Sequence, residues 1–337
     1  MIQNRVIAIN PGSTSTKVAV YVDKRVFFSK DIAHSVEELS NFSTITEQYE
    51  YRKSLILKEL RAINLEENLV GAVVGRGGLV RPIPSGVYKV NKKMLSDLKS
   101  NLLGEHASNL GGLIAYELAN LLPHAKAYIV DPIVVDEMQD IARITGHPSF
   151  ERVSIFHALN HKAVGRQYAH SLGTEYEKLN LIIVHMGGGV SIGAHKKGKV
   201  IDVNNALDGE GPFSPERSGT LPIGALVRLC FSGLHTYKDI QKMLKGKGGY
   251  VAYLGTNNGR EVATKAKKGD KKAKLIQKAL GYQISKYIGE MSVVLNGKID
   301  AIILTGGMAN NIKLTNYIKS NVSFLAPVVL YAGEDEM

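Results

Sequence analysis

The sequence has a single cysteine and no long apolar run, and both shortages limit what the protein can be. Cys230 alone cannot form a disulfide within the chain or build a thiolate cage for a metal. Its neighbours in VRLCFSG are apolar, so we expect a packed, structural thiol. No segment approaches the roughly 18 apolar residues of a membrane-spanning helix. The N-terminus, MIQNRVIAIN, lacks the basic leader and cleavage site of a secretory signal. We therefore expect a cytoplasmic protein that does not enter a membrane.

Acidic residues are also in short supply, with 31 Asp and Glu against 42 Lys and Arg. Most of the net charge of +11 lies between Lys238 and Lys278, where eleven Lys and one Arg face three acidic residues. Within KAKKGDKKAK, no aromatic residues are interleaved at the spacing that stacks nucleotides. The segment therefore favours a solvated helical face, with attraction of anionic substrates as a secondary possibility. We expect no nucleic acid partner, and a steep salt dependence of DNA or RNA binding would be needed to revive that alternative.

The chain contains two matched halves. Residues 5–28 have the pattern strand, Gly/Ser/Thr turn, strand, short turn, strand, and residues 180–203 repeat it around a Gly-rich turn. In each half a later apolar strand runs into paired glycines, in VGAVVGRGG at 70–78 and in IDAIILTGGMANN at 299–311. Matched halves of this kind predict a duplicated domain.

Helical periodicity separates the predicted strands, at residues 51–63, 107–122 and 271–295. Alternating strands and helices predict an α/β layer structure in each half. The segment 154–172 precedes the second repeat and is our candidate for the connection between domains. We therefore place one domain at residues 1–160 and the other at 161–337. No low-complexity linker separates them, so we expect them to pack closely across a cleft.

Two glycine-containing turns could bring the backbone close to a phosphate. NPGSTSTK at 10–17 has neither the spacing of a Walker loop nor that of the dinucleotide fingerprint, and alone it fits an empty tight turn equally well. HMGGGVS at 185–191 has three successive glycines, which cost chain entropy unless the backbone must approach something closely. If the two turns face each other, they form a phosphate clamp. His185 lies beside the second turn, although a lone histidine at a strand end is more often structural.

The combination of five motifs identifies a family. NPGSTSTK, FHALNHK at 156–162, VHMGGGVSIGA at 184–194, ERSG at 216–219 and LTGGMANN at 304–311 together resemble the butyrate kinase branch of the acetate kinase family. The resemblance covers essentially the whole chain in the right order. It implies two ribonuclease H-like domains, the second one nucleotide-binding, with ATP or ADP and substrate in the cleft between them. It also implies a homo-oligomer, at least a dimer.

The resemblance assigns roles residue by residue. His157 matches the histidine that stabilises the transferring phosphoryl group, and His161 is its companion. His185 opens the second phosphate turn, Arg217 is the arginine of the RSG motif, and Asp131 matches a catalytic-site aspartate, which we interpret as an orienting group rather than a base. The remaining contacts that the resemblance implies are His106 at the substrate, and Asn10, Ser13, Ser15, Lys17, Gly187, Gly188, Gly189, Arg260, Gly306, Gly307 and Asn310 at the nucleotide.

The chain departs from the family pattern in one informative place. Acetate kinases have HRVVHGG where this chain has AVVGRGG, so Arg76 stands at a family histidine. We expect Arg76 to supply the missing positive charge. The resemblance further implies Mg²⁺, held by Asn10 and by one acidic residue near the C-terminus. We choose Glu336 for this position, although Glu334 and Asp335 are alternatives.

The residue types suit phosphoryl transfer to a carboxylate. A short-chain acid is already an anion at neutral pH, so the difficulty is its repulsion by the γ-phosphate of ATP, and catalysis should consist of positioning and cationic stabilisation. The resemblance therefore implies reversible phosphoryl transfer from ATP to butyrate or a related short-chain or branched acid, giving an acyl phosphate and ADP. Two alternatives stay open, an acetate or propionate kinase and a non-catalytic ATP-binding clamp like actin or a chaperone.

Overall fold

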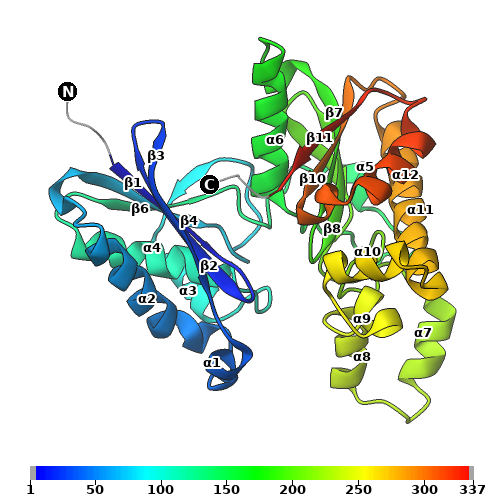
Figure 1. Ribbon diagram of the computed structural model, residues 1–337, viewed down its shortest axis with the longest axis horizontal. Helices are drawn as coiled ribbons and strands as arrows, with labels where there is room; N and C mark the ends of the chain where they lie inside the picture. Colours follow the sequence, from blue (N-terminus) through cyan, green and yellow to red (C-terminus); the bar gives the residue numbers. More distant parts are fainter. Residues whose placement is uncertain (1–4, 334–337) are drawn as a thin grey trace. The chain divides into compact units, whose positions relative to one another are not determined.

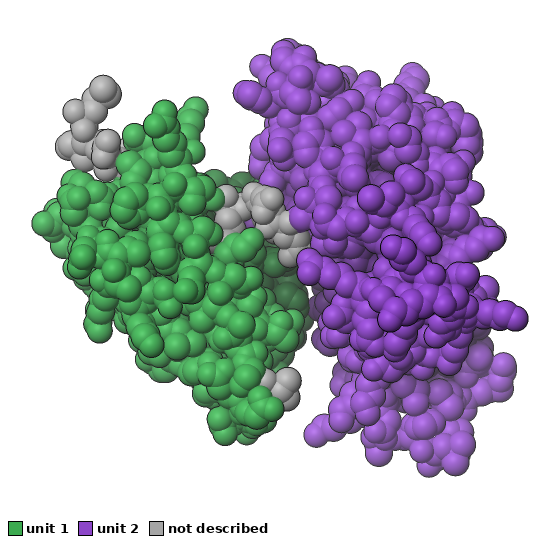
Figure 2. Space-filling view, viewed as in Figure 1, with its two compact units in different colours: residues 1–135, 337 green, residues 136–336 purple. Residues whose placement is uncertain are grey.

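The computed structural model describes residues 5–333 (Figure 1). They form two compact units, one ending at Val135 and the other beginning at Asp136 (Figure 2). This boundary lies before the position near 160 expected from the sequence. Residues between the two positions make contacts within unit 2, since the Gln139 amide donates to the Ile201 carbonyl over 3.1 Å and Arg152 pairs with Asp202 at 2.9 Å.

Unit 1 contains a six-stranded sheet in the order β3-β2-β1-β4-β6-β5. The first two strands run antiparallel, with Asn10 opposite Lys17, and β1 runs parallel to β4. The strands are β1 (Arg5–Pro11), β2 (Ser15–Val22), β3 (Arg25–Ala33), β4 (Val70–Arg76), β5 (Val87–Lys89) and β6 (Lys126–Val130). The helices are α1 (Val36–Ser40), α2 (Tyr49–Ala62), α3 (Lys92–Lys99) and α4 (Asn109–Leu121), with 3₁₀ turns η1 (Thr46–Gln48) and η2 (Glu67–Leu69).

Helices α2 and α4 lie on the same side of the unit 1 sheet (Figure 1). Their apolar residues Ile56, Leu110 and Ile114 are fully buried, as are Val73 and Ile129 of the strands. On α2 only the stripe of Arg52, Ile56 and Leu60 is buried, whereas α4 is buried on all sides from Asn109 to Ala115.

Unit 2 contains a five-stranded sheet in the order β11-β10-β7-β8-β9. Its strands are β7 (Asn180–Met186), β8 (Val190–Lys196), β9 (Lys199–Val203), β10 (Ala301–Gly306) and β11 (Val328–Ala332). The helices are α5 (Asp140–Arg143), α6 (Ala158–Ser171), α7 (Ile223–Cys230), α8 (Tyr237–Leu244), α9 (Gly249–Leu254), α10 (Gly259–Lys267), α11 (Lys271–Val294) and α12 (Ile312–Val322), with η3 (Tyr176–Lys178) and η4 (Gly307–Asn310).

Helices cover both faces of the unit 2 sheet, with α6 on one side and α11 and α12 on the other (Figure 1). Alternate residues of β7 therefore enter different cores. Leu181 and Ile183 pack with Val164 of α6, whereas Ile182 and Val184 belong to the cluster that includes the buried apolar residues of α11. A strand buried on both faces has a continuous apolar sequence, as LIIV does here.

The predicted α/β duplication is confirmed. In each unit an antiparallel three-stranded meander leads the sheet, and two further strands continue it beyond the first strand. The order β3-β2-β1-β4-β6 in unit 1 corresponds to β9-β8-β7-β10-β11 in unit 2, and β5 is an additional edge strand. The first turn in each meander falls at the predicted glycine-containing segment.

The prediction of a packed thiol at Cys230 is wrong. Cys230 is exposed, and no residue of α7 is buried. Its apolar neighbours Val227 and Phe231 are 49% and 87% exposed. The apolar sequence of α7 therefore belongs to the surface of unit 2. No helix among residues 5–333 combines the length and the hydropathy needed to cross a membrane.

Candidate active site

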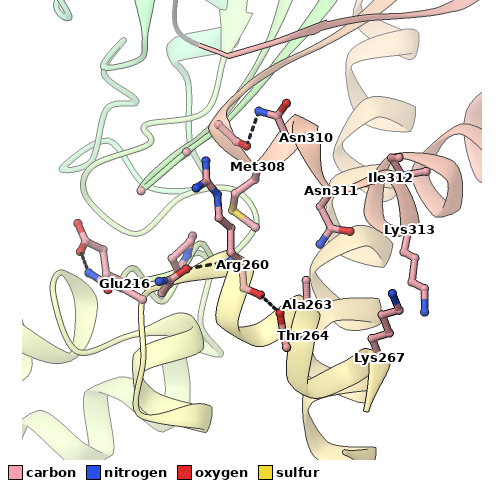
Figure 3. Close-up of a pocket in the computed structure, with 17 residues that line it drawn as sticks. Glu216, Arg260, Ala263, Thr264, Lys267, Met308, Asn310, Asn311, Ile312 and Lys313 are labelled. Atoms are coloured by element: carbon pink, nitrogen blue, oxygen red, sulfur yellow. Dashed lines mark hydrogen bonds between the residues drawn. The ribbon is translucent and has the colours of Figure 1, made fainter. Parts of the chain in front are cut away.

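A pocket of about 780 Å³ lies within unit 2 (Figure 3). The end of β7, the start of α10 and the segment after β10 form its walls. Five of the residues predicted to bind nucleotide line it, namely Gly187, Gly188, Arg260, Gly307 and Asn310. The other lining residues are Pro215, Glu216, Asn257, Asn258, Gly259, Ala263, Thr264, Lys267, Met308, Asn311, Ile312 and Lys313.

The pocket combines helix starts, cations and apolar walls. Asn258 caps α10 by accepting from the backbone N–H of Arg260 at 3.0 Å, and Asn311 caps α12. Partial positive charge gathers at the start of a helix, and Arg260, Lys267 and Lys313 add full charges. The side chains of Met308 and Ile312 add apolar surface. The arrangement suits a ligand with a flat, apolar part and an anionic part.

Gly306 and Gly307, at the end of β10, lie in different surroundings, one packed against the backbone and the other facing the pocket. Gly306 has φ +86°, and a Cβ there would come within 2.5 Å of the Met186 carbonyl oxygen. This position therefore needs glycine for the close approach of β10 to β7. A Cβ on Gly307 would meet nothing within 4 Å, and this residue faces the pocket.

His157 and His185 lie face to face beside the second glycine turn. Their ring centroids are 3.8 Å apart and the ring planes differ by 15°. His185 Nδ1 lies 2.8 Å from Asn160 Oδ1, and because an amide oxygen only accepts, the ring proton of neutral His185 is on Nδ1. His157 Nδ1 lies 2.8 Å from Ser191 Oγ. The start of α6 and the end of β7 thus bring together two histidines that the sequence placed in one site.

Arg217 reaches the same turn because Gly189 has no side chain. A Cβ on Gly189 would lie 2.1 Å from Arg217 Nη1 and 3.2 Å from His157 Cε1. The Arg217 Nη1 also donates to the Ala206 carbonyl over 2.7 Å. The three successive glycines indicated that something must come close to the backbone. At Gly189 the side chains that do so are those of Arg217 and His157, two predicted catalytic residues.

Ser214 fixes the loop that carries Arg217, and no motif in the sequence indicated this role. Its hydroxyl donates to the Gly188 carbonyl over 2.6 Å and accepts from the Arg217 backbone N–H at 3.1 Å. A single buried serine therefore connects the glycine turn to the arginine loop.

Asn10 and Arg76 lie together in unit 1. Arg76 Nη1 donates to Asn10 Oδ1 over 3.2 Å, from the adjacent strands β4 and β1. Ser13 is exposed at the turn, and Ser15 and Lys17 are half-buried at the start of β2. The predicted residues of the first turn are therefore grouped, as the sequence indicated, and Arg76 joins them.

Arg52 was not among the predicted residues, yet it holds the first turn from beneath. Only 1% of Arg52 is exposed, and its guanidinium donates to the carbonyls of Gly12, Ser13 and Ser15 at 2.7, 3.3 and 3.1 Å. Burial lowers the pKa of Arg52 to about 10. The signal was its spacing, four residues before Ile56 on the buried stripe of α2.

Asp131 and His106 are engaged in local structure. Asp131 is buried at φ +37°, and its Oδ1 accepts from the Ser85 hydroxyl at 2.7 Å and the Gly86 amide at 2.8 Å. His106 Nδ1 accepts from the Ser108 amide at 3.2 Å, at the start of α4. Asp131 thus orients a turn, and any part of either residue in a reaction stays a prediction.

The predicted metal ligands are only partly described. Glu336, like its alternatives Glu334 and Asp335, lies outside the described residues. Within residues 5–333, no group of three or more His, Cys, Asp or Glu is arranged to hold a metal ion. Mg²⁺ commonly keeps several waters and binds through substrate phosphates with one or two carboxylates. Asn10 Oδ1 accepts from Arg76, so Asn10 as a Mg²⁺ ligand stays a prediction.

Comparison with known proteins places the chain in a class. Residues 151–325 match the sequence model of the acetokinase family. Together with the relatives below, this match shows that the chain belongs to the acetokinase family.

Two relatives are more specific. The chain is 56% identical over 333 residues to Butyrate kinase 1 of Clostridium acetobutylicum, covering 99% of this chain and 94% of that protein. It is 57% identical to Butyrate kinase 2 of the same organism, covering 99% and 93%. The sequence is thus similar to these butyrate kinases over nearly its whole length.

Solved structures share the fold. An acetate kinase of Porphyromonas gingivalis has a TM-score of 0.79 at 20% identity, and a propionate kinase of Francisella tularensis has 0.77 at 21%. Both comparisons cover 99% of this chain and 97% of the other. At these identities the likeness concerns the fold alone, and it confirms the predicted fold class.

Proposed function

We propose that the protein is a butyrate kinase-like phosphotransferase. It transfers a phosphoryl group reversibly from ATP to butyrate or a related short-chain acid, giving an acyl phosphate and ADP. The observation that carries this proposal is the 56% identity to a butyrate kinase over 99% of the chain. The unit 2 pocket and the grouping of His157, His185 and Arg217 support it.

The chemistry explains why these side chains are cationic or donate hydrogen bonds. The acceptor carboxylate and the γ-phosphate repel each other, so the site must neutralise the phosphoryl group in transfer. Arg217 offers a planar guanidinium that stays charged, and His157 offers a ring N–H. Asn10 and Arg76 are proposed to take part in the same reaction, and Mg²⁺ is proposed to bind together with the phosphates of the nucleotide. The pocket of unit 2, with Arg260 and Gly307 in its walls, is proposed to hold the nucleotide.

A hydroxamate assay tests the proposal. Purified protein, Mg-ATP and hydroxylamine are incubated with a series of linear and branched acids of two to five carbons, and the trapped acyl hydroxamate is measured. We expect four-carbon acids to give higher kcat/KM than acetate, because each methylene is worth about 1–3 kcal/mol in an apolar pocket. Reactions without ATP serve as controls.

Two outcomes contradict the proposal in different ways. Acetate used as well as butyrate identifies an acetate kinase activity instead. No hydroxamate with any acid, while the protein still binds ATP, identifies a non-catalytic clamp.

We also propose that the chain forms a homo-oligomer through an apolar surface on unit 2. This α7 surface consists of Ile223, Val227, Phe231, Leu234 and Tyr237, which are between 49% and 87% exposed. Covered aromatic side chains such as Phe231 and Tyr237 each bury roughly 150–250 Å², and the three aliphatic side chains add to this area. A standard interface buries about 800 Å² per partner, so these five residues can form the apolar centre of an interface with a second copy of the same surface.

Light scattering after size-exclusion chromatography tests this interface. A double variant, Phe231→Asp with Leu234→Asp, should reduce the mass to that of a monomer, whereas Ile144→Asp, at another exposed apolar position of unit 2, should not. A monomeric wild-type protein at micromolar concentration, or an unchanged mass in the double variant, would contradict the proposal.

A further inference from the structure

A chain of hydrogen bonds crosses the interior of unit 2 and ends at His157. Tyr176 Oη lies 2.5 Å from His195 Nδ1, and His195 Nε2 lies 3.1 Å from His161 Nδ1. His161 Nε2 lies 2.9 Å from Ser191 Oγ, which in turn lies 2.8 Å from His157 Nδ1. Tyr176, His195, His161 and Ser191, here called the relay, therefore connect η3 to the start of α6.

The relay is dry and its rings are uncharged. His161, His195 and Ser191 are fully buried, and Tyr176 is 2% exposed. Burial lowers the pKa of His161 to about 3 and that of His195 well below its ordinary value. Each ring therefore carries one proton, so one nitrogen donates and the other accepts. Fixing the direction of one bond fixes all of them.

Two glycines make room for the relay. A Cβ on Gly165 of α6 would lie 2.7 Å from Tyr176 Cε2. A Cβ on Gly193 of β8 would lie 3.2 Å from His195 Nε2 and 3.4 Å from His161 Nδ1. The backbone on both sides thus closes tightly on these side chains, which holds them in one geometry.

The tyrosine sets the direction. A phenol O–H, with an ordinary pKa of about 10, is a far stronger donor than a neutral imidazole N–H, and imidazole nitrogen is the stronger acceptor.

The proton positions then follow along the chain. Tyr176 donates to His195 Nδ1, so the His195 proton is on Nε2 and donates to His161 Nδ1. The His161 proton is therefore on Nε2 and donates to Ser191, which leaves the serine hydroxyl to donate to His157 Nδ1. An imidazole that accepts at Nδ1 carries its own proton on Nε2.

We propose that the relay residues are positioning residues that fix the tautomer of His157 with its ring proton on Nε2. The inference rests on the proposed function, in which His157 contacts the transferring phosphoryl group. A fixed Nε2–H lets the uncharged ring donate a hydrogen bond to a phosphoryl oxygen. The opposite tautomer would present a lone pair there and repel it. Around metal-binding histidines, partners that fix the tautomer typically change activity 10–100-fold when removed, and this sets the scale of the effect expected here.

Nitrogen NMR of histidine-labelled protein tests the relay without measuring activity. In the full-length wild type without nucleotide, long-range proton–nitrogen spectra should show the His157 proton on Nε2. Tyr176→Phe removes the first donor, so His157 should become a mixture of tautomers or carry its proton on Nδ1. His185 is an internal control, because Asn160 fixes its proton on Nδ1 independently of the relay.

Steady-state kinetics complete the test. Tyr176→Phe should lower kcat about tenfold and leave the KM for ATP within about twofold. Tyr250→Phe is the matched control, since it removes another buried phenol hydroxyl of unit 2 that lies outside the relay, and it should change neither kcat nor the His157 tautomer.

The outcomes separate the relay from the proposed function. A wild-type His157 proton on Nδ1, or a lower kcat in Tyr176→Phe with an unchanged tautomer, overturns the relay. A tautomer that responds to Tyr176→Phe in a protein that forms no acyl hydroxamate supports the relay and overturns the proposed function instead.

Discussion

The two units build the same sheet but support their glycine turns differently. In unit 1, Arg52 lies beneath the turn and donates to the carbonyls of Gly12, Ser13 and Ser15, in addition to its bonds to the Gln48 and Thr16 side chains. In unit 2, Ser214 makes the corresponding support by donating to the Gly188 carbonyl. A small hydroxyl beneath the turn leaves room for Arg217 to approach it at Gly189. The buried Arg52 is therefore scaffold, whereas the half-buried Arg217 is our proposed site residue.

The paired glycines after the central strands show the same contrast. In unit 1, a Cβ on Gly77 would lie 2.5 Å from Pro132 Cβ, and one on Gly78 would lie 2.6 Å from Asn109 Cα. These glycines allow tight packing against α4 and the segment after β6. In unit 2, the first glycine, Gly306, also packs tightly, against Met186, but the second, Gly307, meets nothing within 4 Å and faces the pocket. The second glycine of the pair thus packs against the backbone in unit 1 and faces a pocket in unit 2.

The largest effect should come from Arg217→Ala. Removing the charge that stabilises the phosphoryl group should lower kcat by about 100–1,000-fold. Urea unfolding monitored by circular dichroism should change little, because the Arg217 side chain is only half-buried. A kcat within a few-fold of the wild type would remove Arg217 from the site.

Arg52→Met should show the opposite pattern. The change keeps the apolar stem but leaves three turn carbonyls without their charged donor, so the free energy of unfolding should fall by about 3 kcal/mol. Arg61→Met, on the exposed face of the same helix, is the control and should change it by less than about 0.5 kcal/mol. Equal effects of the two substitutions would contradict a scaffold role for Arg52.

Gly189→Ala should push the Arg217 guanidinium away from the glycine turn of unit 2. Its Cβ would lie 2.1 Å from Arg217 Nη1, so the guanidinium must move, and kcat should fall about tenfold or more. Gly188→Ala is the neighbouring comparison. There the nearest atom, Glu216 Oε1, lies at an ordinary 3.6 Å, so any effect should be confined to the KM for ATP. Steady-state kinetics of both variants would decide, and equal losses of kcat would show that the turn needs glycine for another reason.

The smallest effect is a difference in acid sensitivity. Burial first, then Arg52, lowers the pKa of His34 in unit 1 to about 4, and burial lowers those of His161 and His195 in unit 2. Below pH 6.5 these histidines become protonated in the unfolded chain but stay neutral in the folded protein. Their contribution to the free energy of unfolding is therefore fully present above pH 6.5 and is lost as the pH falls towards their folded-state pKa values.

Hydrogen exchange measures this decline in each unit. A fully buried histidine changes the free energy of unfolding by about 1.4 kcal/mol per pH unit in this range, and unit 2 has two of them. Between pH 6.5 and 5, exchange corrected for its intrinsic rate should therefore accelerate more in unit 2. Earlier loss of protection in unit 1 would show that other groups dominate.

Local signals allowed much of the fold and site to be predicted. Strand periodicity and turn residues located both meanders, and the motifs identified His157, His185 and Arg217, which the structure groups at one turn. The unit boundary and the environment of Cys230 were not predictable in this way. An apolar run such as that of α7 has the same local pattern whether a neighbour covers it or not.

The sequence by itself determined which residues can do chemistry and which backbone positions must be glycine, because both depend on residue type and on neighbours a few positions away. Only the tertiary structure decided that Arg52 supports a turn, that Gly78 packs while its counterpart Gly307 lines a pocket, and that a tyrosine in η3 connects to His157. The physical reason is that burial and hydrogen-bond direction depend on partners that lie many residues apart in the chain.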